Sequence, residues 1–324
     1  MSCLSRQRTV VTLAELDVAP WLVRALAFVF GSVWGSFVNV VIYRVPRDLS
    51  VAYPGSRCPA CDAPIRPWDN LPILTFLALR GRARCCGARI SPRYLVVEAL
   101  GGLIAVALVD TAVLTLPGAT PLARAGAVFL GDFGVAMALV AAAFIDAEHM
   151  ILPDAITLGG TVFGLATPAL RGLGWSDALL GAAAGFLGVW LPFVVGYRRL
   201  RGRDGMGLGD AKLVMMAGAL YGWRGAAFAL FVGALQATVA ALILFLVEGK
   251  IEEPAAVRIE REEIVRAAQA GDVEAERVLR EDPLATEPTA GLMSARLPFG
   301  PFLCLAILEW MLAGEWLREH LGLG

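Results

Sequence analysis

The sequence predicts an all-α polytopic membrane protein of about eight transmembrane helices, with a small cytoplasmic cysteine-containing domain and a polar cytoplasmic insertion. Of its 324 residues, 57% are hydrophobic and 18% are charged, and the mean hydropathy is +0.66. A soluble domain usually has about 45–50% apolar and about 25% charged residues. This composition argues against a disordered chain, a nucleic-acid-binding protein and an ordinary cytosolic enzyme.

Long apolar runs carry this prediction. A bilayer core of about 30 Å takes about 20 mostly apolar helical residues to cross. Lipid cannot satisfy backbone polar groups, and runs without alternating polarity do not suit a β-barrel, so helices are expected. The first run lacks a small-residue cleavage site and is not a signal peptide. The predicted spans are 21–43, 95–115, 122–145, 153–170, 177–197, 211–221, 225–247 and 298–317.

Two charged segments interrupt the apolar pattern. Segment 44–93 has nine arginines and three aspartates, a net charge of +6. Because basic loops stay in the cytoplasm, this segment is predicted to be cytoplasmic, with the N-terminus outside. The predicted organisation is then an extracytoplasmic segment 1–20, a first transmembrane helix 21–43, a cytoplasmic cysteine-containing domain 44–94, a transmembrane core 95–247, a cytoplasmic insertion 248–296 and a last transmembrane helix 297–324.

The insertion 248–296 has twelve acidic and seven basic residues, a net charge of −5. Between Ile264 and Leu279, apolar residues recur at helical spacing. One helix pair alone buries little apolar surface. We therefore expect a helical hairpin within a solvated linker, and a docking module is the alternative.

Four cysteines in the basic segment suggest a metal site. Cys58 and Cys61 form a CxxC turn of the kind that zinc knuckles use. The second pair, Cys85 and Cys86, is adjacent, and adjacent cysteines reach one tetrahedral ion less readily. The predicted zinc ligands are Cys58, Cys61 and Cys86, with Cys85 the weakest candidate. Reduced cytoplasmic thiols are the alternative.

Two aspartates stand out among the charges beside the predicted spans. Asp146 follows an apolar run, and Asp210 follows a glycine-rich stretch that opens the short sixth span. Charged groups at membrane depth are costly, so they indicate function. A carboxylate pair could share one proton and act as acid and base in peptide hydrolysis. The same pair could instead form the ion path of a proton- or cation-coupled transporter.

Several motifs, in this order, resemble those of the type IV prepilin peptidase family. The resemblance extends over about 35–317, except for the insertion. The motifs are 35–44 (GSFVNVVIYR), 58–61 (CPAC), 68–72 (WDNLP), 90–94 (ISPRY) with Glu98, the stretch 146–154, 207–212 (GLGDAK) and 297–302 (LPFGPF).

The resemblance implies an intramembrane aspartyl protease of the bacterial inner membrane, with Asp146 and Asp210 as its catalytic pair. Its substrates would be type IV prepilins or type II secretion pseudopilins, cut at the cytoplasmic face, with membrane lipid the other partner and no nucleic acid. The resemblance also implies N-methylation of the new amino terminus with S-adenosyl-L-methionine, associated with the N-terminal half of the chain.

The chain departs from the family pattern at two places. Ala83 stands where the first cysteine of the second pair is expected, so Cys85 would have to replace it. The insertion 248–296 has no counterpart in the compact pattern. A non-catalytic scaffold that used this insertion as its partner surface would leave the placement of both aspartates unexplained.

Overall fold

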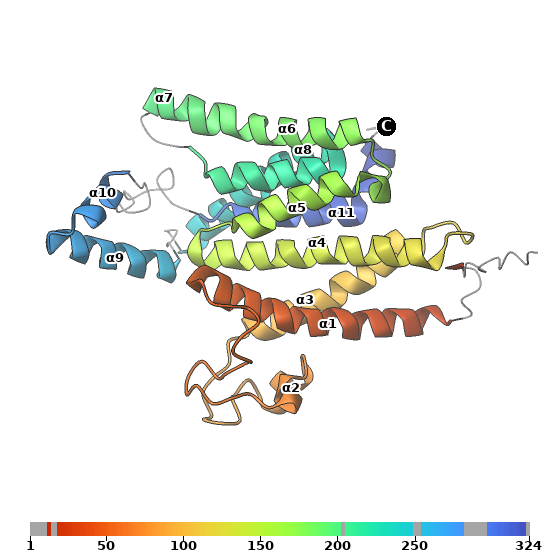
Figure 1. Ribbon diagram of the computed structural model, residues 1–324, viewed down its shortest axis with the longest axis horizontal. Coiled ribbons are helices and arrows are strands. Elements are labelled where there is room, and N and C mark those ends of the chain that lie inside the picture. Colours follow the sequence, from red (N-terminus) through yellow and green to blue (C-terminus); the bar gives the residue numbers. More distant parts are fainter. Residues whose placement is uncertain (1–11, 14–17, 202–204, 249–253, 282–296, 322–324) are drawn as a thin grey trace, which may run out of the picture. The chain divides into compact units, whose positions relative to one another are not determined.

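The computed structural model describes residues 12–13, 18–201, 205–248, 254–281 and 297–321 (Figure 1). Within these ranges the regular elements are helices, with no strand, which confirms the all-α class. Five helical segments are long and apolar enough to cross a membrane: 20–47, 93–113, 122–149, 175–200 and 208–247. Two shorter apolar helices cover 154–166 and 300–314. The chain is thus a multi-pass membrane protein, while eight crossings stay a prediction. Most of the predicted segment 1–20 lies outside the described residues.

The chain divides into two compact units, Met1–Asn39 with Pro54–Met137, and Val40–Tyr53 with Ala138–Gly324. Two helices, α1 (Pro20–Arg44) and α4 (Leu122–His149), run from one unit into the other. The predicted catalytic aspartates both belong to the second unit, and the clustered cysteines belong to the first.

In the first unit, α1 packs closely against α3 (Arg93–Leu108), which continues as the π-helical η4 (Val109–Val113). A Cβ on Gly31 would lie 2.1 Å from the carbonyl oxygen of Gly101, so only glycine allows this approach. At the other end of α1, Arg24 forms a salt bridge of 2.8 Å with Asp110. The small residues of α1 therefore form a helix-packing surface.

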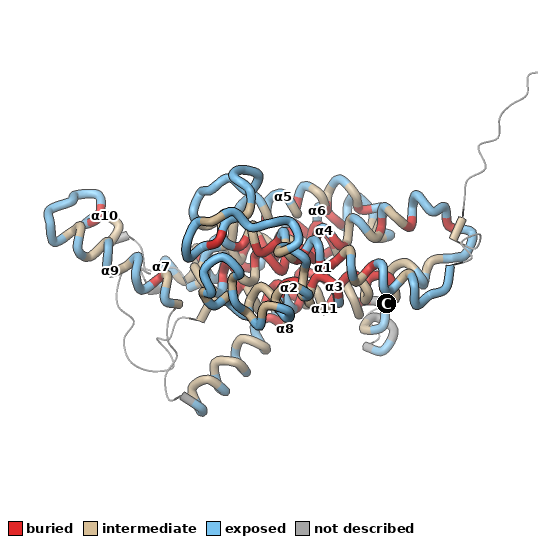
Figure 2. Tube along the Cα trace, turned by 90° about the horizontal axis from the view of Figure 1, so that it is seen from below, coloured by how far each residue is buried: buried red, intermediate tan, exposed pale blue. Residues whose placement is uncertain are grey.

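The cysteine-containing segment has little regular structure and is mostly exposed (Figure 2). It contains the short helices η3 (Pro67–Asn70) and α2 (Leu74–Ala78), and η2 (Val45–Arg47) directly follows α1. Turns and isolated backbone bridges hold the rest. Such a segment has too few buried apolar side chains to be held by a core alone, and a bound metal ion is one means by which segments of this kind are stabilised.

In the second unit, the long helix α8 (Leu208–Glu248) packs against α5 (Asp154–Ala166), α6 (Trp175–Val189) and α11 (Gly300–Leu321). The 3-10 helix η5 (Pro168–Arg171) connects α5 and α6. After α6 the chain continues as the π-helical η6 (Trp190–Gly196) and then α7 (Tyr197–Arg201). Pro192 explains the irregular turn, because proline has no N–H to donate within a helix.

A break at Gly222 divides α8 into two arms. Gly222 has φ 72° and ψ −176°, a backbone conformation that is open almost only to glycine. It lies between the two predicted spans 211–221 and 225–247, which correspond to the two arms. The first arm is short and opens with the glycine-rich motif, so it carries Asp210 at its start.

The insertion contains a helical hairpin, as predicted. Helices α9 (Ala255–Gln269) and α10 (Val273–Glu281) pack against each other (Figure 1). Gly271 turns the chain between them with φ 90°. The remaining insertion residues 249–253 and 282–296 lie outside the described residues.

Candidate active site and cysteine cluster

Asp146 lies near the end of α4 and is buried, with 5% of its surface exposed. The helix ends at His149, after which Met150 has a positive φ of 54° and its N–H donates to the carbonyl oxygen of Asp146. Oδ2 of Asp146 accepts a 2.9 Å hydrogen bond from the main-chain N–H of Gly300, the first residue of α11. Because a helix N-terminus has unpaired N–H groups and a partial positive charge, this contact stabilises a carboxylate in apolar surroundings.

Asp210 is the third residue of α8 and is half-buried. Its carboxylate accepts a hydrogen bond from the main-chain N–H of Gly207, which directly precedes the helix. An acidic residue three positions after the N-cap commonly makes this contact. A Cβ on Gly207 would come within 3.3 Å of Oδ2 of Asp210, so a side chain there would crowd the carboxylate. The glycine-rich motif therefore holds Asp210 in place.

The two aspartates act on each other electrostatically, because the charge of Asp146 repels that of Asp210. The buried thiol of Cys304, one turn along α11 from Gly300, lies in the field of both. Two charged carboxylates in a poorly hydrated site repel each other, and a pair that carries a single proton relieves this repulsion. One group can then accept a proton and the other can donate one.

A salt bridge joins the two helices that begin near the aspartates. Nζ of Lys212 lies 2.6 Å from Oδ1 of Asp154, the first residue of α5. Lys212 follows Asp210 by two positions in α8. The pair fixes the start of α5 to the start of α8. Both residues belong to the quoted motifs, but the motifs do not indicate that they pair.

Glu309 is not among the functional residues that the sequence predicts. Both of its carboxylate oxygens accept hydrogen bonds from Nε2 of Gln236, at 2.9 and 2.8 Å. The pair joins α8 to α11. The position of Glu309 inside the apolar run 298–317 could have indicated a role, because a carboxylate at membrane depth needs a hydrogen-bonding or charged partner. The contact holds together the helices that bear Asp210 and Gly300.

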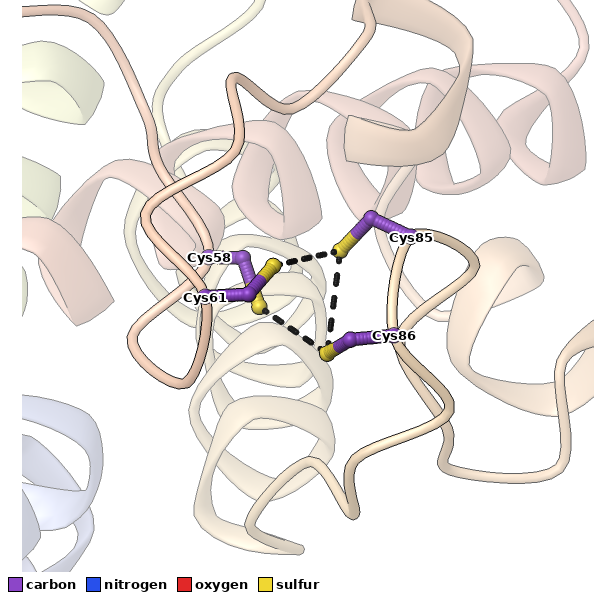
Figure 3. Close-up of side chains that lie close together, drawn as sticks. All are labelled: Cys58, Cys61, Cys85 and Cys86. Atoms are coloured by element: carbon purple, nitrogen blue, oxygen red, sulfur yellow. Dashed lines mark hydrogen bonds between the residues drawn. The ribbon is translucent and has the colours of Figure 1, made fainter.

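The four clustered cysteines lie on two turns of the same construction. In the first turn, the N–H of Cys58 donates to the carbonyl oxygen of Ala63 at 2.9 Å. The N–H of Asp62 donates back to the carbonyl oxygen of Cys58 at 2.8 Å, and Asp62 has a positive φ of 55°. This tight turn brings the side chains of Cys58 and Cys61 to one side (Figure 3).

The second turn repeats this construction around Gly87. The N–H of Gly87 donates to the carbonyl oxygen of Ala83 at 2.8 Å, and Gly87 has a φ of 70°. Ala83 therefore occupies the position of Cys58, and Cys86 that of Cys61. The departure from the family pattern thus falls at a defined position of the second turn. A cysteine at residue 83 would be the equivalent of Cys58.

The four sulfur atoms converge (Figure 3). The Sγ–Sγ distances are 3.4 Å for Cys61–Cys85, 3.7 Å for Cys58–Cys86 and 3.9 Å for Cys85–Cys86, and all four atoms lie within 4.8 Å of one another. Tetrahedral zinc, with Zn–S bonds of about 2.3 Å, places its sulfurs about 3.8 Å apart. Although an adjacent pair is expected to reach one ion less readily, the turn directs both Cys85 and Cys86 toward the cluster.

The thiols of the cluster ionise unequally. A main-chain hydrogen bond from Ala60, with a second from Cys61, lowers the pKa of Cys58 to about 7. Contacts with the thiols of Cys61 and Cys58 raise the pKa of Cys85 to about 12. Four neighbouring sulfurs cannot all ionise without a compensating positive charge. A divalent cation would supply that charge, so the donor set fits zinc.

Comparisons with known families match two consecutive stretches of the chain. Residues 29–111 match the bacterial peptidase A24 N-terminal domain, and residues 133–244 match the type IV leader peptidase family. A prepilin leader peptidase/N-methyltransferase from Myxococcus xanthus is 34% identical over 325 residues, which cover 91% of this chain and 91% of that protein. The chain belongs to the type IV leader peptidase family.

Other relatives of the same name agree with this membership. The Klebsiella pneumoniae protein is 38% identical over 63% of this chain and 88% of its own length, and the Neisseria gonorrhoeae protein is 33% identical over 74% and 88%. No solved structure matches the chain. The leader peptidase match contains both Asp146 and Asp210, and the A24 N-terminal match contains the cysteine cluster. The insertion lies outside both matches.

Proposed function

We propose that the chain is a prepilin leader peptidase and N-methyltransferase, with Asp146 and Asp210 as the peptidase catalytic pair. The observation that carries the peptidase half is the proximity of these two carboxylates, each held by a main-chain N–H, within the stretch that matches the leader peptidase family. Relatives that share most of the chain's length bear both activities in their names.

The pair is suited to acid–base hydrolysis of a peptide bond. One carboxylate removes a proton from water, and the water oxygen bonds to the scissile carbonyl carbon. The protonated partner polarises the carbonyl, and a proton then passes to the leaving nitrogen as the C–N bond breaks. Main-chain donors at Gly300 and Gly207 fix one oxygen of each carboxylate, which leaves the other oxygens for water and substrate.

The substrates follow from the family and from the predicted orientation. We infer that the enzyme lies in the bacterial inner membrane and cuts type IV prepilins or type II secretion pseudopilins at the cytoplasmic face. The charge of segment 44–93 supports this orientation, because its net +6 favours the cytoplasmic side. The new amino terminus is then methylated with S-adenosyl-L-methionine as the methyl donor.

Zinc is the second proposed cofactor. The convergent sulfurs of Cys58, Cys61, Cys85 and Cys86 have the number and spacing of a closed structural site. Such an ion would stabilise a segment that has little core of its own and would take no part in peptide hydrolysis. Metal analysis of the purified protein should give about one zinc per chain. A metal-free, fully active protein would show that the thiols are free.

A transporter is the competing class that the residue chemistry allows, and the relatives reported above do not support it. The relatives named here are prepilin leader peptidase/N-methyltransferases. A transporter would also be expected to have repeated broken helices in both halves. In the described residues, Gly222 is the single non-helical break within a long apolar helix.

The test is coexpression with a prepilin, followed by mass measurement of the product. Wild-type protein should remove the leader and add one methyl group to the new amino terminus. Asp146→Asn and Asp210→Asn should each abolish cleavage, because Asn keeps the shape but cannot exchange the proton. Asp177→Asn, which changes an exposed carboxylate of the same unit, is the matched control and should cleave normally. Normal processing by either active-site variant would overturn the aspartyl assignment.

A further inference from the structure

The two family matches divide the two proposed activities between two stretches of chain. The leader peptidase match at 133–244 contains the aspartate pair, so the A24 N-terminal match at 29–111 is the stretch available for methyl transfer. Among the described residues of this stretch, Glu98 is the only buried carboxylate, with 7% of its surface exposed. A buried acidic group in an apolar helix needs an explanation, and peptide hydrolysis at Asp146 and Asp210 does not use it.

Glu98 is held between α1, α3 and the cysteine-containing segment. It is the sixth residue of α3, and Oε2 accepts a 2.7 Å hydrogen bond from the main-chain N–H of Ile73. The carboxylate also accepts a hydrogen bond from the side chain of Ser36 on α1. A Cβ on Gly35 would lie 2.7 Å from the Cα of Glu98, so glycine lets α1 approach closely here. The hydrogen bonds from Ile73 and Ser36, together with the close approach of α1 at Gly35, therefore fix the position of the carboxylate.

The contact at Ile73 stabilises a strained backbone. Ile73 has φ 62° and ψ −52°, which a β-branched residue rarely adopts. It forms the centre of a γ-turn in which the N–H of Leu74 donates to the carbonyl oxygen of Pro72. Strain of this kind persists where the surroundings impose it and is frequent at functional sites. Here the hydrogen bond from Ile73 to the carboxylate of Glu98 holds the strained conformation in place.

A second buried acceptor lies one turn away. Asn39 is 1% exposed, and its Nδ2 donates to the carbonyl oxygens of Tyr94 and Gly35 at 3.1 and 3.4 Å. These bonds fix the amide so that Oδ1 is buried without a hydrogen-bond partner. Tyr94 precedes Glu98 by one helical turn, so both acceptors belong to the same crossing of α1 and α3. A buried acceptor without a donor is costly unless a ligand supplies one.

The chemistry of these groups identifies the ligand class. A carboxylate and an unpaired amide oxygen in apolar surroundings offer negative charge and hydrogen-bond acceptors. A primary ammonium group offers the complement, since it has one positive charge and three N–H donors. A bound anion or a phosphate would instead be repelled by Glu98.

We propose that Glu98 and Asn39 bind the amino-terminal ammonium group of the cleaved prepilin, the methyl acceptor, and that Glu98 takes one proton from it. This inference rests on the proposed function, because only a leader peptidase generates that amine. Proton transfer from the nitrogen to the carboxylate leaves a neutral amine and a neutral carboxylic acid. The amine nitrogen then has the lone pair that a methyl acceptor needs, while Oδ1 of Asn39 accepts one of its remaining N–H groups.

Two substitutions separate this role from a purely structural one. In Glu98→Gln, the amide oxygen can still accept the Ile73 N–H, so the strained turn keeps its partner while the charge is lost. This variant should cleave prepilin within twofold of wild type and methylate the product at least about 100-fold more slowly, the scale of a lost general base. Glu98→Ala removes both the charge and the contact with Ile73. The matched control is Asp110→Asn, which changes an exposed carboxylate on η4, the π-helical turn that follows α3. This variant should keep both activities.

A binding measurement supplies a readout that does not depend on methyl transfer. The probes are two synthetic peptides with the first residues of the mature pilin, one with a free amino terminus and one acetylated. Wild-type protein should bind the free amine at least tenfold more tightly, and Glu98→Gln should bind the two peptides equally.

The outcomes separate this inference from the proposed function. Normal methylation by Glu98→Gln, together with loss in Glu98→Ala, would overturn the inference and show that Glu98 only supports the turn at Ile73. Equal binding of both peptides by wild-type protein would also overturn it. A wild-type protein that never cleaves prepilin would overturn the proposed function itself. A wild-type protein that cleaves prepilin but never methylates it would overturn the methyltransferase half of the proposed function, and with it this inference.

Discussion

The main-chain N–H of Gly300 donates a buried 2.9 Å hydrogen bond to Oδ2 of Asp146, across 154 positions of sequence. A Cβ at residue 300 would lie 2.7 Å from that oxygen and 3.0 Å from Cδ2 of Leu152. The first residue of α11 must therefore be glycine for the carboxylate to keep its place. The LPFGPF motif thus contributes directly to the aspartyl site.

Gly300→Ala should reduce prepilin cleavage by about 100-fold, because displacing a catalytic group by about 1 Å can cost that much. The protein should still fold, since the added methyl group meets the ends of two side chains, those of Asp146 and Leu152, and not a backbone. Initial rates of leader removal would measure the effect. Gly314→Ala is the control in the same helix, because its Cβ would have contacts of 3.4 Å or longer. Equal rates for both variants would show that the Gly300 contact is unimportant.

The Lys212–Asp154 salt bridge should contribute modestly to the active-site geometry. Its groups are 20% and 59% exposed, and exposed ion pairs contribute about 0.2–1 kcal/mol. Lys212→Glu should therefore lower kcat/KM severalfold by placing like charges together. The double variant Lys212→Glu with Asp154→Lys should recover much of the loss. A double variant that is no better than the single one would indicate that Lys212 acts independently of Asp154.

The sequence predicts those features of the fold and the site that depend on residues close together in the chain. Apolar runs predicted most helices, and charges beside apolar runs singled out Asp146 and Asp210 as candidates, because both signals depend on neighbouring residues. The contact of Gly300 with Asp146 joins segments 154 positions apart, and no local pattern encodes it. The convergence of Cys85 with the other three cysteines is not encoded locally either, since it depends on a turn and not on cysteine spacing.

The Gln236–Glu309 pair should stabilise the packing of α8 on α11. Glu309→Leu alone leaves the Gln236 amide without its partner, and a buried unpaired polar group costs about 1–3 kcal/mol. The double variant Gln236→Leu with Glu309→Leu removes both polar groups and should recover most of that stability. Thermal unfolding in detergent would compare them. If the double variant is the least stable protein, the pair contributes more than the packing that replaces it.

Zinc retention should fall as the pH falls, because protons compete with the metal for thiolates. The pKa of Cys58, about 7, makes this ligand the easiest to ionise, whereas the pKa of Cys85, about 12, makes that thiol bind its proton tightly. Binding of zinc therefore displaces protons, and acid reverses it. A chromogenic chelator would report zinc release, which should accelerate from pH 8 to pH 5. Release independent of pH would argue against thiolate ligands.

The position of Ala83 provides a sharper test of the metal site. Ala83 occupies in the second turn the place that Cys58 occupies in the first, as the repeated hydrogen bonds show. Cys85→Ser alone should therefore lose most of the zinc, because three ligands remain. Ala83→Cys combined with Cys85→Ser should restore one zinc per chain, since the sulfur moves to the regular position of the turn. Elemental analysis of both variants measures this directly. If the double variant stays metal-free while wild type binds zinc, a cysteine at residue 83 cannot replace Cys85 as a ligand. The two turns would then not be equivalent in metal binding.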